Sequence, residues 1–500
     1  MHERPSGIPC LHLRRPDISS KGMILPPAYR PDPSFAALGP DFADAVAPAD
    51  FPKAEPRYWN HRWAREMGLD GLDAKARRRH FHRFEPLPDN QSAPLAIRYH
   101  GHQFRTYNPQ IGDGRGFLFA QARDSRGRLL DFATKGSGQT PHSRSGDGRL
   151  TLKGAVREVL AAEMLEALGV YTSKAFCVYE TGEALHRGDE PSPTRSAVLT
   201  RLSHSHVRFG AFQRHAYFDR SDLVGELAAY AVESLVPEAG AHPGGLGVGL
   251  LDVACRRSAQ LAAQWMAAGF VHGVLNTDNL VVTGESFDYG PWRFLPHFEP
   301  GFTAAYFDHS GLYAYGRQPE SVFWALQQLG GALSLIAERE ALIEALSGFP
   351  EHYKRAVRTA FLHRLGLEAL DDDADGAFVT AFLDAMKVTR LPFEAVFFDW
   401  FCGDQGRALA SPRAGTYKSE LFASVRDGVA AREPVRPERL EHAYFARSEP
   451  VHLVIEAVEG LWAPIAENDD WSAFEAALEA IGEARAGYDL GQGQPGFLQD

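Results

Sequence analysis

The chain has 500 residues, of which 44% are hydrophobic and 23% are charged, and this ordinary globular composition excludes a disordered or collagen-like protein. Aspartate and glutamate outnumber lysine and arginine by 64 to 52, so the formal net charge of −12 disfavours nucleic acid as the main partner. The length allows one elaborated enzyme fold or two to three packed modules.

The four cysteines are Cys10, Cys177, Cys255 and Cys402, and their wide spacing predicts neither a disulfide framework nor a thiolate zinc site. The first residues do not have the pattern of a signal peptide, and no stretch approaches the length of an uncharged membrane span. We therefore expect a cytoplasmic protein that is neither exported nor inserted into a membrane.

The first third of the chain reads as an irregular start followed by strands. Residues 1–33 are rich in proline and arginine and predict an irregular arm, and residues 34–93 predict a packed N-terminal cover. Strand-like runs at 95–99, 116–120 and 129–134, separated by glycine and aspartate turn signals, predict a small antiparallel sheet.

The rest of the chain changes from strands to helices. Residues 153–168 have the apolar spacing of an amphipathic helix, and strand signals return at 175–179 and 196–200. Helical spacing then dominates at 223–236, 251–268, 319–346, 352–365, 376–386, 418–431 and 472–486. Two apolar runs that flank Gly284 predict a short hairpin within 279–288. An α+β protein with two lobes is expected, with a strand-rich lobe at 94–215, a helical lobe at 216–403 and a helical extension at 404–500.

Two features of the strand-rich lobe suggest a phosphate site. Gly112, Gly114 and Arg115 lie between two predicted strands, where glycines let backbone amides approach a phosphate. A simple Gly-Asp-Gly turn explains the same residues without a phosphate. Lys135 ends a predicted strand and Glu158 lies in the following helix. A strand lysine paired with a helix glutamate is an arrangement that holds nucleotide phosphates.

A second set of motifs follows in the helical lobe. A loop at 272–279 begins with a histidine and ends with Asn279, and Asp288-Tyr289-Gly290 comes after the predicted hairpin. Asn279 and Asp288 at this separation can bind one divalent cation, which in turn neutralises phosphate oxygens. The order of these motifs along the chain is typical of a protein-kinase-like fold. A glycine loop comes first, followed by a lysine, a glutamate, a histidine-led loop, an asparagine and an Asp-aromatic-Gly turn.

One position departs from that pattern. Kinases place a catalytic aspartate two residues after the histidine, where this chain has Val274, which cannot accept a proton. Asp278 offers a base from another position in the loop, which suggests that the reacting phosphorus has also moved. A further glycine-rich loop at 143–149, together with Arg201 and Arg208, can grip a nucleotide in an unusual orientation, although each arginine alone is more typical of a surface ion pair.

These motifs together resemble the selenoprotein O family of protein adenylyltransferases from about residue 34 to about residue 329. The segments that carry the resemblance are 101–104, 112–116, 143–149, 199–201 with 208–210, 272–279 and 288–291. The resemblance implies a bilobal, protein-kinase-like pseudokinase fold that binds ATP inverted, so that AMP is transferred to Ser, Thr or Tyr hydroxyls of proteins.

The resemblance also implies a role for each matching position. The residues at the nucleotide phosphates are Gly112, Gly114, Arg115, Lys135 with its partner Glu158, and Asp288. The residues that hold the inverted nucleotide are Asp147, Gly148, Arg201 and Arg208. The metal ligands for Mg²⁺, or Mn²⁺, are Asn279 and Asp288, and the proton acceptor is Asp278.

Two departures and two alternatives accompany this interpretation. The family often ends in a selenocysteine or cysteine motif, whereas the last cysteine here is Cys402, and no Asn-Pro-x-Tyr-type segment follows residue 404. Redox control through a C-terminal thiol is therefore not indicated, and a divergent extension is expected. The alternatives are a phosphotransferase that uses Asp278 as its base and a catalytically silent pseudokinase scaffold that binds nucleotide.

An acidic run at 371–376 resembles the first half of a calcium-binding loop but is better explained as a helix cap.

Overall fold

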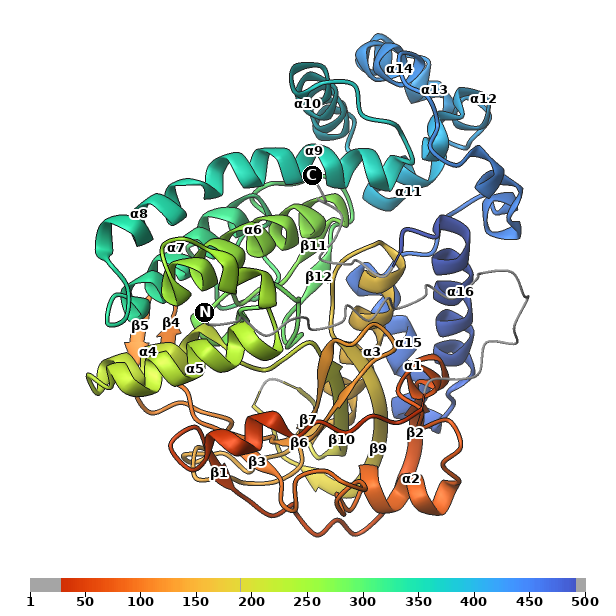
Figure 1. Cartoon of the computed structure of the whole chain (residues 1–500). Helices are drawn as coiled ribbons and strands as arrows, with labels where there is room; N and C mark the ends of the chain where they lie inside the picture. Colours follow the sequence, from red (N-terminus) through yellow and green to blue (C-terminus); the bar gives the residue numbers. More distant parts are fainter. Residues whose placement is uncertain (1–27, 189, 492–500) are drawn as a thin grey trace, which may run out of the picture.

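The computed structural model describes residues 28–188 and 190–491. Most of the predicted N-terminal arm, together with Cys10 and the last nine residues, lies outside the described residues. The fold is mixed α and β, with an eight-stranded sheet in one part and many helices in the other (Figure 1). This is compatible with the predicted α+β class. No described helix is both long and apolar enough to cross a membrane.

The main sheet is antiparallel and has the order β1-β3-β6-β7-β10-β9-β2, with β8 pairing with β10. Its strands are β1 (Ala43–Ala45), β2 (Glu55–Trp59), β3 (Leu95–Ile97), β6 (Leu118–Arg123), β7 (Leu129–Lys135), β8 (Leu150–Thr151), β9 (Lys174–Leu185) and β10 (Thr194–Ser203). The predicted antiparallel sheet is thus present and larger than expected, because the predicted cover supplies both edge strands, β1 and β2.

Three helices accompany the sheet: α1 (His61–Glu66), α2 (Ala74–Phe81) and α3 (Leu152–Ala167). The Thr151 side chain caps α3 by accepting a hydrogen bond from the backbone N–H of Gly154. Val156, Val159 and Leu160 of α3 are fully buried, and the helix contacts β9 and β10. The amphipathic spacing in the sequence therefore places α3 with its apolar face on the sheet.

The helical part begins after β10. Its helices are α4 (Phe209–Tyr217), α5 (Ser221–Ser234), α6 (Leu246–Ala267), α7 (Gln318–Leu333), α8 (Arg339–Ser347), α9 (Phe349–Leu365), α10 (Asp372–Thr389), α11 (Phe393–Asp399), α12 (Gln405–Ala408), α13 (Ala414–Tyr417), α14 (Ala423–Ala430), α15 (Ile455–Asn468) and α16 (Ser472–Tyr488). The single helix predicted at 319–346 is wrong, because the chain breaks between α7 and α8 and packs Ile336 and Ala337 against Gly247 of α6. The acidic run does cap a helix: the Asp371 side chain accepts hydrogen bonds from two backbone N–H groups at the start of α10.

Two small two-stranded sheets complete the fold, β4 (Gly101–Gln103) with β5 (Thr106–Asn108) and β11 (Phe270–Val271) with β12 (Arg293–Phe294). The β4–β5 hairpin belongs to the strand-rich part of the sequence, yet it lies beside α4 and α7 of the helical part (Figure 1). The strand-rich part therefore contributes one element to the other side of the molecule.

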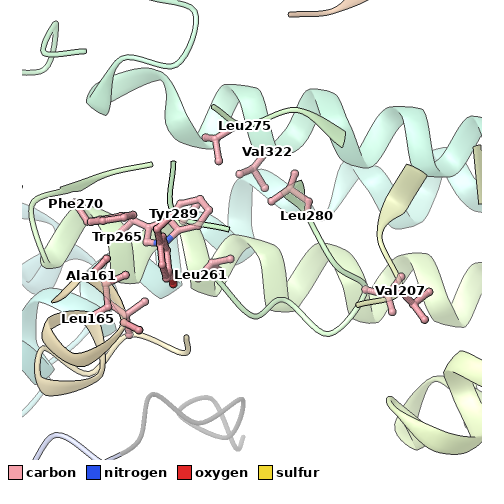
Figure 2. Packing of buried hydrophobic residues seen from close by; sticks show 14 of the residues in the cluster. Ala161, Leu165, Val207, Leu261, Trp265, Phe270, Leu275, Leu280, Tyr289 and Val322 are labelled. Atoms are coloured by element: carbon pink, nitrogen blue, oxygen red, sulfur yellow. The ribbon is translucent and has the colours of Figure 1, made fainter. Parts of the chain in front are cut away.

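A single hydrophobic cluster joins the two parts. Ala161 and Leu165 of α3 lie near Trp265, Phe270 and Tyr289 of the helical part (Figure 2). The C-terminal helices α15 and α16 return to pack against α3 (Figure 1). Because α3 is enclosed from three sides, its polar face is held at a fixed place relative to the sheet.

Candidate functional site

A cleft of about 630 Å³ opens between the glycine-rich loops of the strand-rich part and the 272–279 loop of the helical part. It is lined by Tyr99, Gln103, Ile111, Gly112, Gly114, Arg115, residues 142–149, Arg187, Asp278 and Asp288. A smaller cavity of about 60 Å³ continues inward past Lys135, Arg201 and Arg208. The structure thus brings most of the predicted site residues to one cleft.

The predicted glycine loop is built by close backbone approach. A Cβ atom on Gly116 would lie 2.0 Å from the Thr134 carbonyl oxygen, and one on Gly114 would lie 2.8 Å from the His142 carbonyl oxygen. A Cβ on Gly112 would meet the His142 ring at 2.5 Å. Only glycine fits at these positions, and the first glycine loop therefore rests directly on the segment that leads into the second.

Lys135 is the centre of a buried charge network. Its Nζ forms an ion pair with Glu158 of α3 and lies 2.7 Å from Asp288 Oδ1, and both Lys135 and Glu158 are buried. Arg201 Nη1 lies 3.1 Å from the same Asp288 oxygen. Burial alone would raise the pKa of Asp288, but Lys135, Arg201 and Arg208 hold it well below its usual range. Asp288 is therefore ionised and serves as the counterion of these cations.

Arg208 connects the glycine loop to the 272–279 loop. Its guanidinium donates to Asp113 Oδ1 at 3.0 Å and to the backbone carbonyl of Asp278 at 2.7 Å. The same group stacks on the rings of Tyr99 and Phe287, at 4.6 and 4.9 Å from their centroids. A planar guanidinium held by two hydrogen-bond acceptors and two rings has a fixed orientation.

Asp278 lies at the cleft with a carboxylate that is only partly satisfied. Its side chain is buried, and Oδ1 has no hydrogen-bond partner. Burial raises the pKa of Asp278 to about 6, while the positive charge of Arg208 opposes this shift and the nearby Asp288 adds to it. A buried carboxylate with a free oxygen and a pKa near neutrality has the properties of a general base.

Asn279 follows Asp278 and is half-buried. Its side-chain Nδ2 donates to the carbonyl of Val274 at 3.0 Å, which leaves Oδ1 available to a ligand. No group of three His, Cys, Asp or Glu side chains that could hold a metal ion occurs in residues 28–188 and 190–491. Asp288 lines both cavities, whereas Asn279 is not among the residues that line either of them.

The predicted hairpin at 279–288 is wrong. The chain does turn at Gly284, whose φ is +68°, but the two arms do not pair with each other. The first arm instead bonds to Val207 and Phe209, and the second arm bonds to the segment that precedes β9. These backbone groups bond to segments outside the two arms, so tertiary pairing replaces the local hairpin.

Asp147 and Gly148 occupy the outer edge of the cleft. Asp147 forms an ion pair with Arg187 at 2.8 Å and accepts a hydrogen bond from the backbone N–H of Arg149 at 2.9 Å. Gly148 has a φ of +68°, and a Cβ there would lie 2.2 Å from the carbonyl carbon of Gly138. Arg187 was missed by sequence reasoning, because it lies in the connection between β9 and β10 and no motif surrounds it.

The chain is similar to one protein family and to several named relatives. The family model described as "Protein adenylyltransferase SelO" matches residues 28–482, which extends well beyond the segments that carry the resemblance. A protein of Gloeobacter violaceus named "Protein nucleotidyltransferase YdiU" is 44% identical over 471 residues, covering 91% of this chain and 95% of that protein. Proteins of the same name from Synechocystis sp. and Azotobacter vinelandii are 46% and 34% identical, and they cover 90% and 87% of this chain and 97% and 91% of their own lengths. The chain therefore belongs to the protein adenylyltransferase SelO family.

Proposed function

We propose that this protein transfers AMP from ATP to Ser, Thr or Tyr hydroxyls of other proteins. The observation that carries the proposal is the position of the base. Asp278 lines the cleft and has a buried carboxylate whose Oδ1 makes no hydrogen bond, whereas Val274 occupies the place where a kinase would have its catalytic aspartate. The acceptor hydroxyl would therefore be activated at a different point from that in γ-phosphoryl transfer.

The reaction uses one bond formation and one bond cleavage. The acceptor oxygen bonds to the α-phosphorus while the bond from that phosphorus to the oxygen bridging to the β-phosphate breaks. The carboxylate of Asp278 receives the hydroxyl proton, and pyrophosphate leaves with the electron pair. Lys135, Arg115, Arg201 and Arg208 stabilise the negative charge that develops on the phosphate oxygens.

The nucleotide would lie inverted compared with ATP in a kinase. The glycine loops and Arg115 line the wide part of the cleft, and Asp147 and Gly148 line its outer edge. Arg201 and Arg208 lie at the inner cavity. This distribution supports an α-phosphate near Asp278, with Gly112 and Gly114 on the phosphate chain.

Asn279 and Asp288 would hold Mg²⁺ or Mn²⁺ when nucleotide binds. Both residues supply oxygen donors of the kind that hard divalent cations prefer, and the hydrogen bond from Asn279 to Val274 leaves its amide oxygen free. The cation would neutralise phosphate charge and orient the triphosphate. Two protein ligands leave room for phosphate and water oxygens, as is usual for a nucleotide-bound Mg²⁺.

We further propose a bilobal, protein-kinase-like organisation around this cleft. The strand-rich lobe would span residues 94–215 and the helical lobe residues 216–403. Residues 34–93 would form the N-terminal cover, and residues 404–500 the helical extension. The position of the cleft between the two glycine loops and the 272–279 loop supports this organisation.

Labelled ATP tests the proposed reaction. Purified protein is incubated with a protein acceptor, Mg²⁺ and ATP labelled either at the α- or at the γ-phosphate. We expect the α-label on the acceptor and no γ-label, and D278N is the control that should lose the signal. Protein-bound γ-label without α-label would identify a phosphotransferase, and neither label, with ATP still bound, would identify a silent nucleotide-binding scaffold.

A further inference from the structure

Exposed aromatic side chains gather around the β4–β5 hairpin. The described part of the chain has ten exposed large hydrophobic side chains, and five of them surround this one hairpin: Phe104, Tyr217, Phe218, Tyr306 and Phe307. Single exposed aromatics are ordinary, but a concentration of them marks an interaction site. Three of the five are called the aromatic patch below: Phe307 contacts both Phe104 and Tyr306.

The turn of the hairpin has a strained backbone and an exposed phenylalanine side chain, that of Phe104. Phe104 and Arg105 form the two-residue turn, with φ values of +49° and +62°. Such turns favour Asn-Gly, because a bulky residue in the left-handed region costs about 1–3 kcal/mol. Despite this, the Phe104 side chain remains 36% exposed, so packing into the core does not explain why a phenylalanine stands there.

The hairpin is anchored to the loop that carries Asp278. The Phe104 backbone N–H donates to Asn276 Oδ1 at 3.0 Å, and the His102 N–H donates to Thr277 Oγ1 at 2.8 Å. The approach is as close as glycine allows, since a Cβ on Gly101 would lie 2.8 Å from the same Thr277 oxygen. The hairpin and the 272–279 loop therefore form one rigid unit.

The aromatic patch is continuous with the cleft. Gln103 lines the cleft together with Asp278, and Phe104 is the next residue. The Phe104 ring contacts the Phe307 ring at a centroid distance of 5.8 Å and the Tyr313 ring at 5.0 Å. The Tyr313 hydroxyl donates to the same Asn276 oxygen that holds Phe104, which joins the loop bearing Tyr306 and Phe307 to this unit.

The charged residue beside Phe104 in the turn has an acidic partner. Arg105, beside Phe104, forms an ion pair with Glu320 at 3.0 Å and stacks over the Trp324 ring. Its charge is thus already compensated by a neighbour. An uncharged, apolar side chain suits this surface better than an acidic or basic one.

We propose that the aromatic patch binds the acceptor segment of the protein substrate, an extended segment with an aliphatic or aromatic side chain close to the modified hydroxyl residue. This inference rests on the proposed adenylyl transfer, because a protein acceptor extends beyond the cleft, whose lining includes Gln103 next to Phe104. A stable dimer buries about 1,200–2,000 Å². Three side chains suit instead the brief contact between an enzyme and its protein substrate.

The test measures transfer of α-labelled AMP to dephosphorylated casein, an unfolded protein that exposes hydroxyl residues with varied neighbours. The variant Y306S/F307S removes the two outer rings and does not touch the cleft. We expect its kcat/KM for casein to fall at least about tenfold, mainly through KM, while the Kd for ATP changes less than about twofold. Mass spectrometry of the casein sites should show apolar neighbours enriched with the wild type and not with the variant.

The matched control is I343S/V388S, which removes two apolar side chains that are 54% and 64% exposed elsewhere on the helical part. It should behave as the wild type in both measurements. A Y306S/F307S variant with unchanged kcat/KM and unchanged site preference overturns the docking role while leaving adenylyl transfer intact. Absence of α-label with the wild type overturns both proposals.

Discussion

At the scale of one residue, the buried carboxylate of Asp278 lowers the free energy of unfolding of the protein. Its pKa of about 6 means that ionising the carboxylate is harder in the folded protein than in the unfolded chain, where the ordinary value is 3.8. The folded state is therefore destabilised as pH rises from about 4 to 6, and the loss persists above that range. We expect D278N to raise the free energy of unfolding by about 1–3 kcal/mol at pH 8, and to have little effect at pH 4. Chemical denaturation at both pH values measures this difference, and an equal effect at both would contradict the assigned burial cost.

The same pKa predicts how the activity depends on pH. A general base works only when it is ionised, so log kcat/KM for AMP transfer should rise with a slope of about one up to about pH 6 and then level off. The rise reports Asp278 and should be seen at saturating metal. A profile that is flat between about pH 5 and 7 would assign the proton to another group.

Gly116 shows how closely the backbone of the first glycine loop approaches the backbone of β7. An alanine Cβ would lie 2.0 Å from the Thr134 carbonyl oxygen, and the loop would have to move away from β7. We expect G116A to lower the melting temperature and to raise the Kd for ATP at least about tenfold. The control is G71A, since a Cβ on Gly71 meets nothing within 4 Å. Equal ATP affinity of G116A and wild type would mean that the loop position does not matter for binding.

At the scale of elements, α3 is the part whose position the rest of the chain controls. It carries Glu158, the partner of Lys135, and its far end is held by α16, where Arg485 forms ion pairs with Glu163 and Glu166. At its near end, Lys153 lies 2.7 Å from Glu459 of α15. The C-terminal helices thus fix the helix that positions the lysine at the phosphates.

Removing this support should affect both stability and nucleotide binding. R485M leaves two largely buried carboxylates with one partner fewer, so we expect a loss of about 2 kcal/mol in unfolding free energy and a several-fold higher Kd for ATP. The control is R447M, which breaks a more exposed pair with Glu483 on the same helix and should change little. Thermal unfolding and ATP titration of both variants provide the comparison. Stability lost with unchanged ATP affinity would show that α16 does not influence the site.

The elements also show how far sequence reasoning reaches. The spacing at 153–168 predicted α3 within one or two residues, and the acidic run at 371–376 predicted a helix cap, which Asp371 provides for α10, because both signals are local. Three features are set by tertiary contacts that leave no local pattern in the sequence. They are the break between α7 and α8, the pairing of the 279–288 arms with other segments, and the position of β4–β5 beside the helical part. In the site, motif order predicted Lys135, Glu158 and Asp278, and the structure places Lys135 and Asp278 in the lining of the two cavities. Arg187 reaches the cleft only through folding and was missed, and Gln103 belongs to the 101–104 segment that carries the resemblance but was given no role.

At the scale of the whole molecule, the cleft unites groups that are far apart in the chain, and binding should therefore report on the complete fold. Lys135 and Glu158 come from the strand-rich part, whereas Asn279 and Asp288 come from the helical part. Although the chain carries a net charge of −12, the inner cavity gathers Lys135, Arg201 and Arg208, and all three of these cations lie close to Asp288. A triphosphate that enters the cleft competes with Asp288 for these cations. A divalent cation on Asp288 would remove that competition, since it gives the carboxylate a new partner.

ATP and Mg²⁺ should consequently stabilise the protein together by more than the sum of their separate effects. A ligand present at a hundred times its Kd adds about 2.7 kcal/mol to the stability of the folded state. We expect the melting temperature to rise strongly with ATP and Mg²⁺ together and weakly with either alone, and EDTA should remove the extra shift. N279A should lose most of the extra shift and keep the stability of the free protein, because Asn279 is half-buried and the substitution removes the side-chain hydrogen bond to Val274 but leaves the backbone bond to Asn276. Two results would contradict this: a melting-temperature shift that EDTA does not change, or one that N279A retains in full. Either would show that ATP binds without a cation at Asn279 and Asp288, and the phosphates alone would then have to balance the charge around Asp288.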